Sequence, residues 1–439
     1  MHKRFTLLWL LLGLGSRLQV VASLSITEFA VLMLAPFIFI KNYKQMMRDG
    51  IWTIFILSLL VIVGCIIGSI ANNSPPEAVL RGMAVTCIVA CSIIVSHWIL
   101  RNCPSGFKWM LLGIAISVFL STFMFQNIGE VVQFGEDAES IRSGPLYRIS
   151  RLNPLIMLPS KGWYLQTPTF VSVIAPLFMA GFAMLTTVSG RSAALGAIGF
   201  AAIVLIGGKT RRSIHKISRH FGLVVFCGIV LIGVVYVGYK VSASQGLLGA
   251  KAQAKYEQQS HGGEGGIGRL LLGGRMDSFV GFLACRDKPI VGWGPWPVDT
   301  NGYTEEFLSR FGTYEDVITL QKANESARLY GYRTGLIQCH AYITEFWVWY
   351  GIFGLLFWVY VIFVMLRYLK EDVAAVPQWF AWLACSIPGM FWGIFFSPFA
   401  DRFGVPLFVV ACLMARSVRK GLVQLPLEMI VEIEKAERK

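Results

Sequence analysis

Two arginines and one histidine have the residue types and positions that best suit chemistry on a phosphorylated substrate. Arg191 follows Ser189 at the start of an apolar run, Arg275 follows two glycines in a long polar segment, and His340 ends that segment. An arginine guanidinium is planar, stays charged and binds two phosphate oxygens at once. A histidine with an ordinary pKa of about 6.5 can accept a proton near neutral pH. Together these residues suit displacement of a phosphate leaving group by a hydroxyl.

Each of these residues also has a structural interpretation. The long side chain of Arg191 could extend to lipid phosphates at a membrane boundary. Arg275 could form a surface ion pair with Asp277 or Asp287. His340 could serve only to start a helix. The chemical interpretation requires all three to face one cavity.

Metal and nucleotide cofactors have no recognisable binding motif in the sequence. It contains no Asp-x-Asp, no Cys/His zinc spacing and no phosphate-binding G-x-x-x-x-G-K-[ST] motif. The glycines of 263–268 match G-x-G-x-x-G, but no strand-to-helix context surrounds them. The sequence thus offers no obvious ligand set for a metal, and we predict no metal and no cofactor.

The composition places these residues in a membrane. The chain has 439 residues, of which 55% are hydrophobic and 15% charged, and its mean hydropathy is +0.61. This apolar content excludes a soluble enzyme, a β-barrel, a coiled coil and a disordered chain. The apolar residues form runs long enough to cross a bilayer. We predict crossings near 5–21, 25–41, 51–70, 79–99, 109–126, 167–187, 191–207, 219–239, 341–366, 377–396 and 403–418.

Basic residues between the crossings predict their orientation. Positive loops stay on the cytoplasmic side, and this accounts for much of the net charge of +14. Five basic loops are therefore predicted to be cytoplasmic: Lys41, Lys44 and Arg48; Arg101 and Lys108; Lys209, Arg211, Arg212, Lys216 and Arg219; Arg367 and Lys370; and Arg416, Arg419 and Lys420. The loop 71–78, which has no basic residue, and the segment from about 240 to 340 are then outside.

Eleven crossings cannot leave both ends of the chain inside, so either a weakly apolar crossing is hidden in 127–166 or one of the runs is broken or re-entrant. We predict about twelve crossings, and the sequence does not place the additional one. The sequence divides into helices in 1–239 with an outside loop at about 127–166, a large outside loop in 240–340, helices in 341–418 and a cytoplasmic tail in 419–439. Cys285 and Cys339 are the two cysteines of the large loop. Disulfides form outside the cytoplasm, and we predict one between them.

Three segments together resemble the O-antigen ligase family and the wider group of membrane polysaccharide ligases and polymerases. The first is Ser-x-Arg at 189–191. The second is Gly-Arg at 274–275 followed by Lys-Pro-x-x-Gly-x-Gly at 288–294. The third is His340 with Gly351 and Gly354 behind it. The resemblance covers about 190–360. It departs from the family at Ala341, where Asn is frequent, and at Glu345, where Gln is frequent.

This resemblance implies an all-α polytopic membrane protein, a GT-C-like bundle of about twelve transmembrane helices with one large periplasmic loop. It implies a glycosyltransferase of the bacterial inner membrane whose active site faces the periplasm. The donor would be O-antigen polysaccharide on undecaprenyl pyrophosphate and the acceptor lipid A–core. The partners would thus be these two substrates and membrane lipid, with no nucleic acid.

The resemblance also implies roles for particular residues. Arg191 and Arg275 would bind the pyrophosphate, and His340 would take the proton of the acceptor hydroxyl as the anomeric centre inverts. Trp293 and Trp296 could stack on sugar rings. The possible supporting residues are Ser189, Asp277, Glu345 and Arg402, the last in an outside turn beside Asp401.

Two other functions remain open at this point. A polymerase that joins lipid-linked repeat units would use the same arginines and histidine. A membrane transporter would instead carry charged residues at the bilayer midplane and often an internal repeat. The sequence has no evident repeat, and the notable charges lie near the predicted outer face, which disfavours the transporter.

Overall fold

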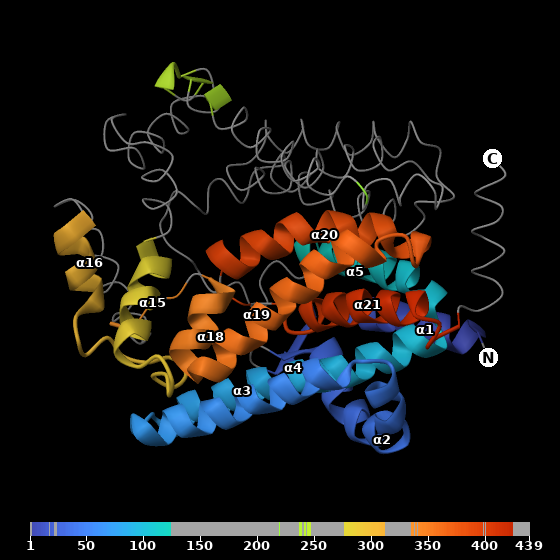
Figure 1. Ribbon diagram of the computed structural model, residues 1–439, viewed down its shortest axis with the longest axis horizontal. Helices are drawn as coiled ribbons and strands as arrows, with labels where there is room; N and C mark the ends of the chain where they lie inside the picture. Colours follow the sequence, from blue (N-terminus) through green and yellow to red (C-terminus); the bar gives the residue numbers. More distant parts are fainter. Residues whose placement is uncertain are drawn as a thin grey trace.

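The computed structural model describes residues 2–16, 18–21, 24–123, 276–311, 335–337, 339, 341–397, 399 and 401–424, with isolated residues at 219, 237–238, 241–242 and 244–246. These residues form long helices that run side by side, with shorter helices across one end (Figure 1). The helices are α1 (His2–Gly15), α2 (Ile26–Arg48), α3 (Trp52–Ala71), α4 (Pro76–Asn102), α5 (Phe107–Phe123), α15 (Met276–Asp287), α16 (Tyr303–Phe311), α18 (Tyr342–Tyr350), α19 (Ile352–Arg367), α20 (Pro377–Phe396) and α21 (Gly404–Arg419).

Short elements complete the described chain. They are a two-stranded hairpin of β1 (Gln19–Val21) and β2 (Leu24–Ser25), a 3-10 turn at Pro104–Gly106 and a π-helical turn at Tyr368–Asp372. The hairpin shortens the predicted crossing 5–21, since α1 ends at Gly15.

The described residues have the character of an all-α membrane protein. Four helices are long and apolar enough to cross a bilayer: Ile26–Arg48, Trp52–Ala71, Pro76–Asn102 and Ile352–Asp372. Isoleucines and leucines on their outer sides are left exposed, as expected for side chains that contact lipid. The helical membrane fold is therefore confirmed at this level. The predicted crossings between 167 and 239 and the region 127–166 lie outside the described residues.

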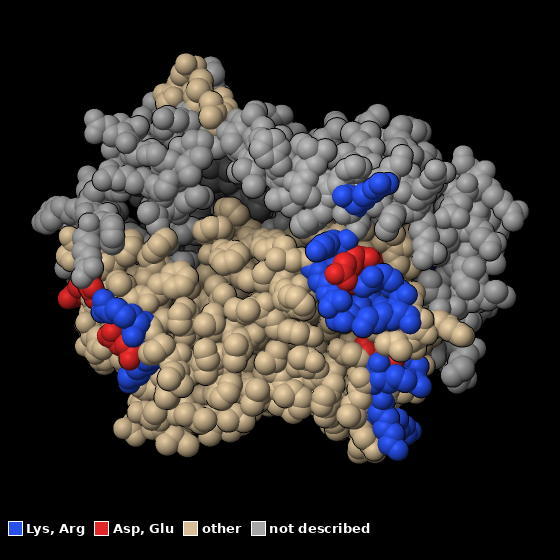
Figure 2. Space-filling view, in the orientation of Figure 1, with Lys and Arg blue, Asp and Glu red and all other residues tan. Residues whose placement is uncertain are grey.

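Several long helices have basic residues at one of their ends. These basic ends lie together on one side of the bundle. The Asp49 carboxylate, just after α2, accepts a hydrogen bond from Arg101 of α4, and the Asp49 carbonyl accepts one from Ser417 Oγ of α21 at 2.6 Å. Arg419 of α21 lies 2.5 Å from Asp372, at the end of α19. Four of the five predicted basic loops thus share one side. We call this the basic end, and Figure 2 shows Lys and Arg gathered there.

Asp49 is the centre of this basic end. Its side chain is fully buried, and its Oδ2 lies 2.9 Å from His97 Nε2 as well as bonding to Arg101. Burial by itself raises the pKa of Asp49, but the hydrogen bonds to His97 and Arg101 and the charge of Arg101 outweigh burial, so the pKa lies below its ordinary value. One carboxylate therefore ties the α2–α3 turn to α4.

The opposite end, which we call the loop end, holds the 71–76 turn, α15, α16 and the turn between α20 and α21. Here the structure corrects the prediction of one continuous crossing over 341–366. The helix breaks at Gly351, whose φ of 63° and ψ of −146° do not fit a helix. Phe346 in α18 stacks on Phe357 of α19, with ring centroids 5.9 Å apart. In a straight helix, residues eleven apart are separated by about 16 Å, so α18 folds back against α19.

Candidate functional site

The three residues that carry the predicted chemistry, Arg191, Arg275 and His340, lie outside the described residues, as does the supporting candidate Ser189. Asp277 belongs to α15, although its side chain is not described. The residues next to Arg275 and His340 in the chain are described. Met276, which begins α15, follows Arg275, and Cys339 precedes His340. The described part of the site is therefore the frame that holds these neighbours.

The Lys-Pro-x-x-Gly-x-Gly segment forms a tight turn and sits at the break between α18 and α19. The Gly292 amide donates to the Lys288 carbonyl at 3.1 Å, which closes the turn. The Ile352 amide, at the start of α19, donates to the Ile290 carbonyl at 2.9 Å, and the Trp293 amide donates to the Val348 carbonyl of α18 at 2.6 Å. Two of the three segments that define the family resemblance are therefore in direct contact.

Gly351 makes this contact possible. A Cβ atom on Gly351 would overlap the Ile290 carbonyl oxygen and lie 2.7 Å from the Val291 carbonyl carbon. Its positive φ is also one that residues with a side chain rarely adopt. Glycine at this position thus serves both the bend of the chain and its close approach to the turn.

Asn72, at the end of α3, fixes the same turn from the other side. Its side-chain amide donates to the Gly292 carbonyl at 3.0 Å, and its side-chain oxygen accepts from Lys288 Nζ. The Lys288 ammonium also lies 3.9 Å from the centroid of the Trp293 ring, a favourable cation–π geometry. The positive charge of Lys288 is therefore used to hold the turn. Sequence reasoning missed Asn72, whose signal is a polar residue directly after an apolar run.

The two tryptophans considered as sugar platforms are engaged in packing. Trp293 is 8% exposed, and its indole N–H donates to the Ala284 carbonyl of α15 at 2.9 Å. The Trp296 ring packs on Trp349 with centroids 4.3 Å apart. Trp293 thus joins the turn to α15, and little of its ring remains for a sugar.

The structure does not form the predicted disulfide, and Cys285 and Cys339 are both buried thiols. The Cys339 sulfur packs against α15 at Gly281, 3.0 Å from where a Cβ atom would stand, and Cys285 follows one helical turn later. Burial in apolar surroundings raises the pKa of the Cys285 thiol. The contact at Gly281 fixes residue 339 on α15 by packing and without a covalent bond.

Glu345 and Arg402 meet the same turn, between α20 and α21. Glu345 is 7% exposed, and its carboxylate accepts the Phe399 amide hydrogen bond at 3.0 Å. Arg402 lies 3.6 Å from Glu28 at the start of α2, and its neighbour Asp401 accepts from the Gly404 amide at 2.7 Å, which begins α21. These contacts place both supporting candidates at the loop end in bonds that hold helices together.

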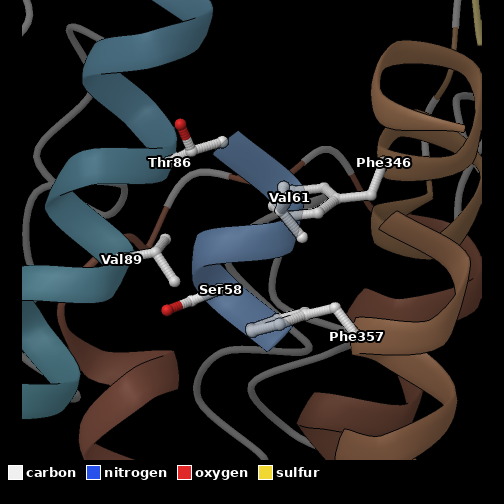
Figure 3. A pocket seen from close by; sticks show the side chains of 6 residues that line it. All are labelled: Ser58, Val61, Thr86, Val89, Phe346 and Phe357. Atoms are coloured by element: carbon white, nitrogen blue, oxygen red, sulfur yellow. The ribbon is translucent and has the colours of Figure 1, made fainter. Parts of the chain in front are cut away.

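A narrow gap lies between α3, α4, α18 and α19, and it has no room for a water molecule. Figure 3 shows its lining side chains: Ser58, Val61, Thr86, Val89, Phe346 and Phe357. The Ser58 hydroxyl donates to the Phe55 carbonyl and the Thr86 hydroxyl to the Met83 carbonyl, so both O–H donors are already used within their own helices.

Among the described residues, no group of three His, Cys, Asp or Glu side chains could hold a metal ion. The polar groups of the described residues at the loop end hold helices and turns together. This arrangement can position a loop at the membrane boundary. No family model, curated protein or solved structure matches this chain.

Proposed function

We propose that this protein is an O-antigen ligase of the bacterial inner membrane. It transfers O-antigen polysaccharide from undecaprenyl pyrophosphate to lipid A–core, with inversion at the anomeric carbon and without a metal. The proposal starts from the family resemblance of the segments around Arg191, Arg275 and His340. A polymerase of lipid-linked repeat units is the alternative within the same group.

One observation carries the proposal beyond the resemblance. Cys339 packs against Gly281 on α15. Met276, which follows Arg275, is five residues before Gly281, or roughly 8 Å along the helix axis. His340 is the next residue after Cys339, with a Cα spacing of about 3.8 Å. The packing of these chain neighbours supports a single site in which Arg275 and His340 reach one substrate.

The reaction follows from the chemistry of the three side chains. The acceptor hydroxyl oxygen forms a bond to the anomeric carbon, and the bond from that carbon to the pyrophosphate oxygen breaks. The electron pair goes to the pyrophosphate, where Arg191 and Arg275 meet the growing negative charge with paired N–H groups. The hydroxyl proton goes to His340. No other reactant is needed.

The test uses the purified protein in lipid nanodiscs with lipid-linked polysaccharide, with and without lipid A–core. We expect product only when lipid A–core is present, and none from His340→Ala, Arg191→Lys or Arg275→Lys. Arg286→Lys is the matched control, since Arg286 is exposed on α15 and bonds only to surface acids among the described residues. Chain lengthening without acceptor would favour the polymerase, and full activity of all three variants would refute the proposed site.

Addition of a chelator tests the absence of a metal in the same assay. Unchanged transfer supports direct binding of the pyrophosphate by arginine, whereas loss of transfer with rescue by a divalent cation would contradict it.

A further inference from the structure

Helix α15 has apolar side chains on two opposite faces. Val280, Ala284 and Cys285 are buried against the rest of the protein, with exposures of 2%, 0% and 2%. On the other side Phe279 is 38% exposed and Phe282 44% exposed. A helix in water needs only one apolar face to pack on the protein. The second face therefore requires a partner.

The exposed phenylalanines belong to a continuous aromatic strip, which we define as Phe307, Phe279, Phe282 and Trp347. Phe279 stacks on Phe307 of α16 with centroids 6.2 Å apart, and it lies 6.3 Å from Phe282. Phe282 meets the edge of Trp347 on α18, also at 6.3 Å. The Trp347 indole N–H donates to the Pro289 carbonyl. These contacts hold the two exposed rings in fixed positions on the surface.

The position of α15 identifies the partner. Figure 1 shows α15 lying across the loop end of the bundle, whereas α3 and α4 run along its length. Ile70, in the last turn of α3, is 74% exposed and belongs to the apolar surface of a candidate membrane span. Asn72 follows it and bonds to Lys288, one residue beyond α15. The end of α15 is thereby fixed where α3 leaves the lipid.

The described charged side chains at the end of α15 lie next to the aromatic strip, with Arg286 one helical turn beyond Phe282 on the same face. Arg286 bonds to Asp287 at 3.0 Å and lies 3.4 Å from Glu306 on α16, so the charges form one small group at the end of α15. Figure 2 shows this group as a small charged area at the loop end, beside an uncharged surface. Beyond it, Ile290 is 68% exposed. Large apolar side chains left at the surface are stabilised where they can enter the boundary between headgroups and acyl chains.

We propose that α15 is an interfacial helix whose partner is the phospholipid leaflet at the loop end, the outer leaflet by the predicted orientation. Phe279, Phe282 and Ile290 enter the boundary between headgroups and acyl chains, and the Arg286 group stays among the headgroups. The leaflet thus covers the second apolar face of the helix. Lipid contact at α15 does not depend on enzymatic activity. Absence of this contact would therefore not bear on the proposed transferase activity.

Spin labels in nanodiscs test this contact. Labels on Phe279→Cys and Phe282→Cys are compared with Ile70→Cys, in the lipid-facing end of α3, and with Glu305→Cys, on the exposed side of α16. Unsubstituted protein treated in the same way gives the background. We expect positions 279 and 282 to match position 70, with a ratio of oxygen to water-soluble nickel accessibility severalfold above that at 305.

A ratio at 279 and 282 equal to that at 305 would overturn the interfacial placement, and so would low accessibility to both reagents. A second measurement avoids the cysteine substitution. Benzoylphenylalanine at position 282 keeps the aromatic ring and should cross-link to phospholipid on illumination. Cross-links only within the protein would count against lipid contact.

Discussion

Replacing Gly351 with alanine should separate the Lys288–Gly294 turn from the α18–α19 break. The backbone at Gly351, with φ of 63° and ψ of −146°, is close to a region that only glycine adopts readily, and holding alanine there costs about 1–3 kcal/mol. The new methyl group would overlap the Ile290 carbonyl oxygen, and such overpacking adds about 1–3 kcal/mol. The expected loss of stability is therefore about 2–6 kcal/mol, against a total of about 5–15 kcal/mol for a typical protein.

Gly389→Ala provides the matched control. Gly389 lies inside α20, and a Cβ atom there would have no neighbour within 4 Å. Alanine in a helix interior is favoured over glycine by about 0.5–1 kcal/mol, so this variant should be as stable as the unsubstituted protein or slightly more stable.

Thermal unfolding in detergent, followed with a thiol-reactive dye, measures both variants. Cys285 and Cys339 are 2% and 9% exposed and flank the turn, so they react only when this region opens. Gly351→Ala should react at a clearly lower temperature than Gly389→Ala and should lose transfer activity. Equal unfolding temperatures and equal activity would refute the assignment of Gly351 as the residue on which this contact depends.

Three further outcomes are expected. Asp49→Asn removes the carboxylate from two buried partners and should lower stability by about 3–5 kcal/mol. The pKa of Asp49 is lower in the folded protein than in the unfolded chain. The stability that Asp49 contributes is therefore present above the ordinary pKa of about 3.9 and is lost as the pH falls through the lower pKa of the folded protein. The unfolding temperature of Asp49→Asn should thus vary less with pH in acid than that of the unsubstituted protein. Asn72→Ala leaves Lys288 and the Gly292 carbonyl without this partner and should lower the stability of the turn by about 1–3 kcal/mol, seen as faster hydrogen exchange at 288–294. Alkylation after unfolding without reductant should modify both Cys285 and Cys339, and a mass that shows either protected would contradict the absence of a disulfide between them.

The helices of the bundle could be predicted because the length of an apolar run is a local property of the sequence. The runs at 51–70, 79–99 and 377–396 became α3, α4 and α20. The shared side of four basic loops also followed from local charge, and the contacts of Asp49 confirm it.

The contacts of the candidate site could not be predicted in the same way. Gly351 within an apolar run is compatible with a straight helix, and only the Ile290 carbonyl, sixty residues away, requires the bend. Asn72 and Lys288 are 216 residues apart, and no local pattern pairs them. The disulfide prediction relied on the predicted location of both cysteines outside the cytoplasm. The position of Cys339 is instead set by its packing against Gly281, and no disulfide forms.

The hydrogen bond from Ser417 to the Asp49 carbonyl joins positions 368 residues apart. A ribosome adding about 5–20 residues per second needs roughly 20–70 s to make the intervening chain. During that interval the turn after α2 is already made, while α21, which completes its surroundings, does not yet exist. The first helices therefore enter the bilayer before their packing partner α21 has been made.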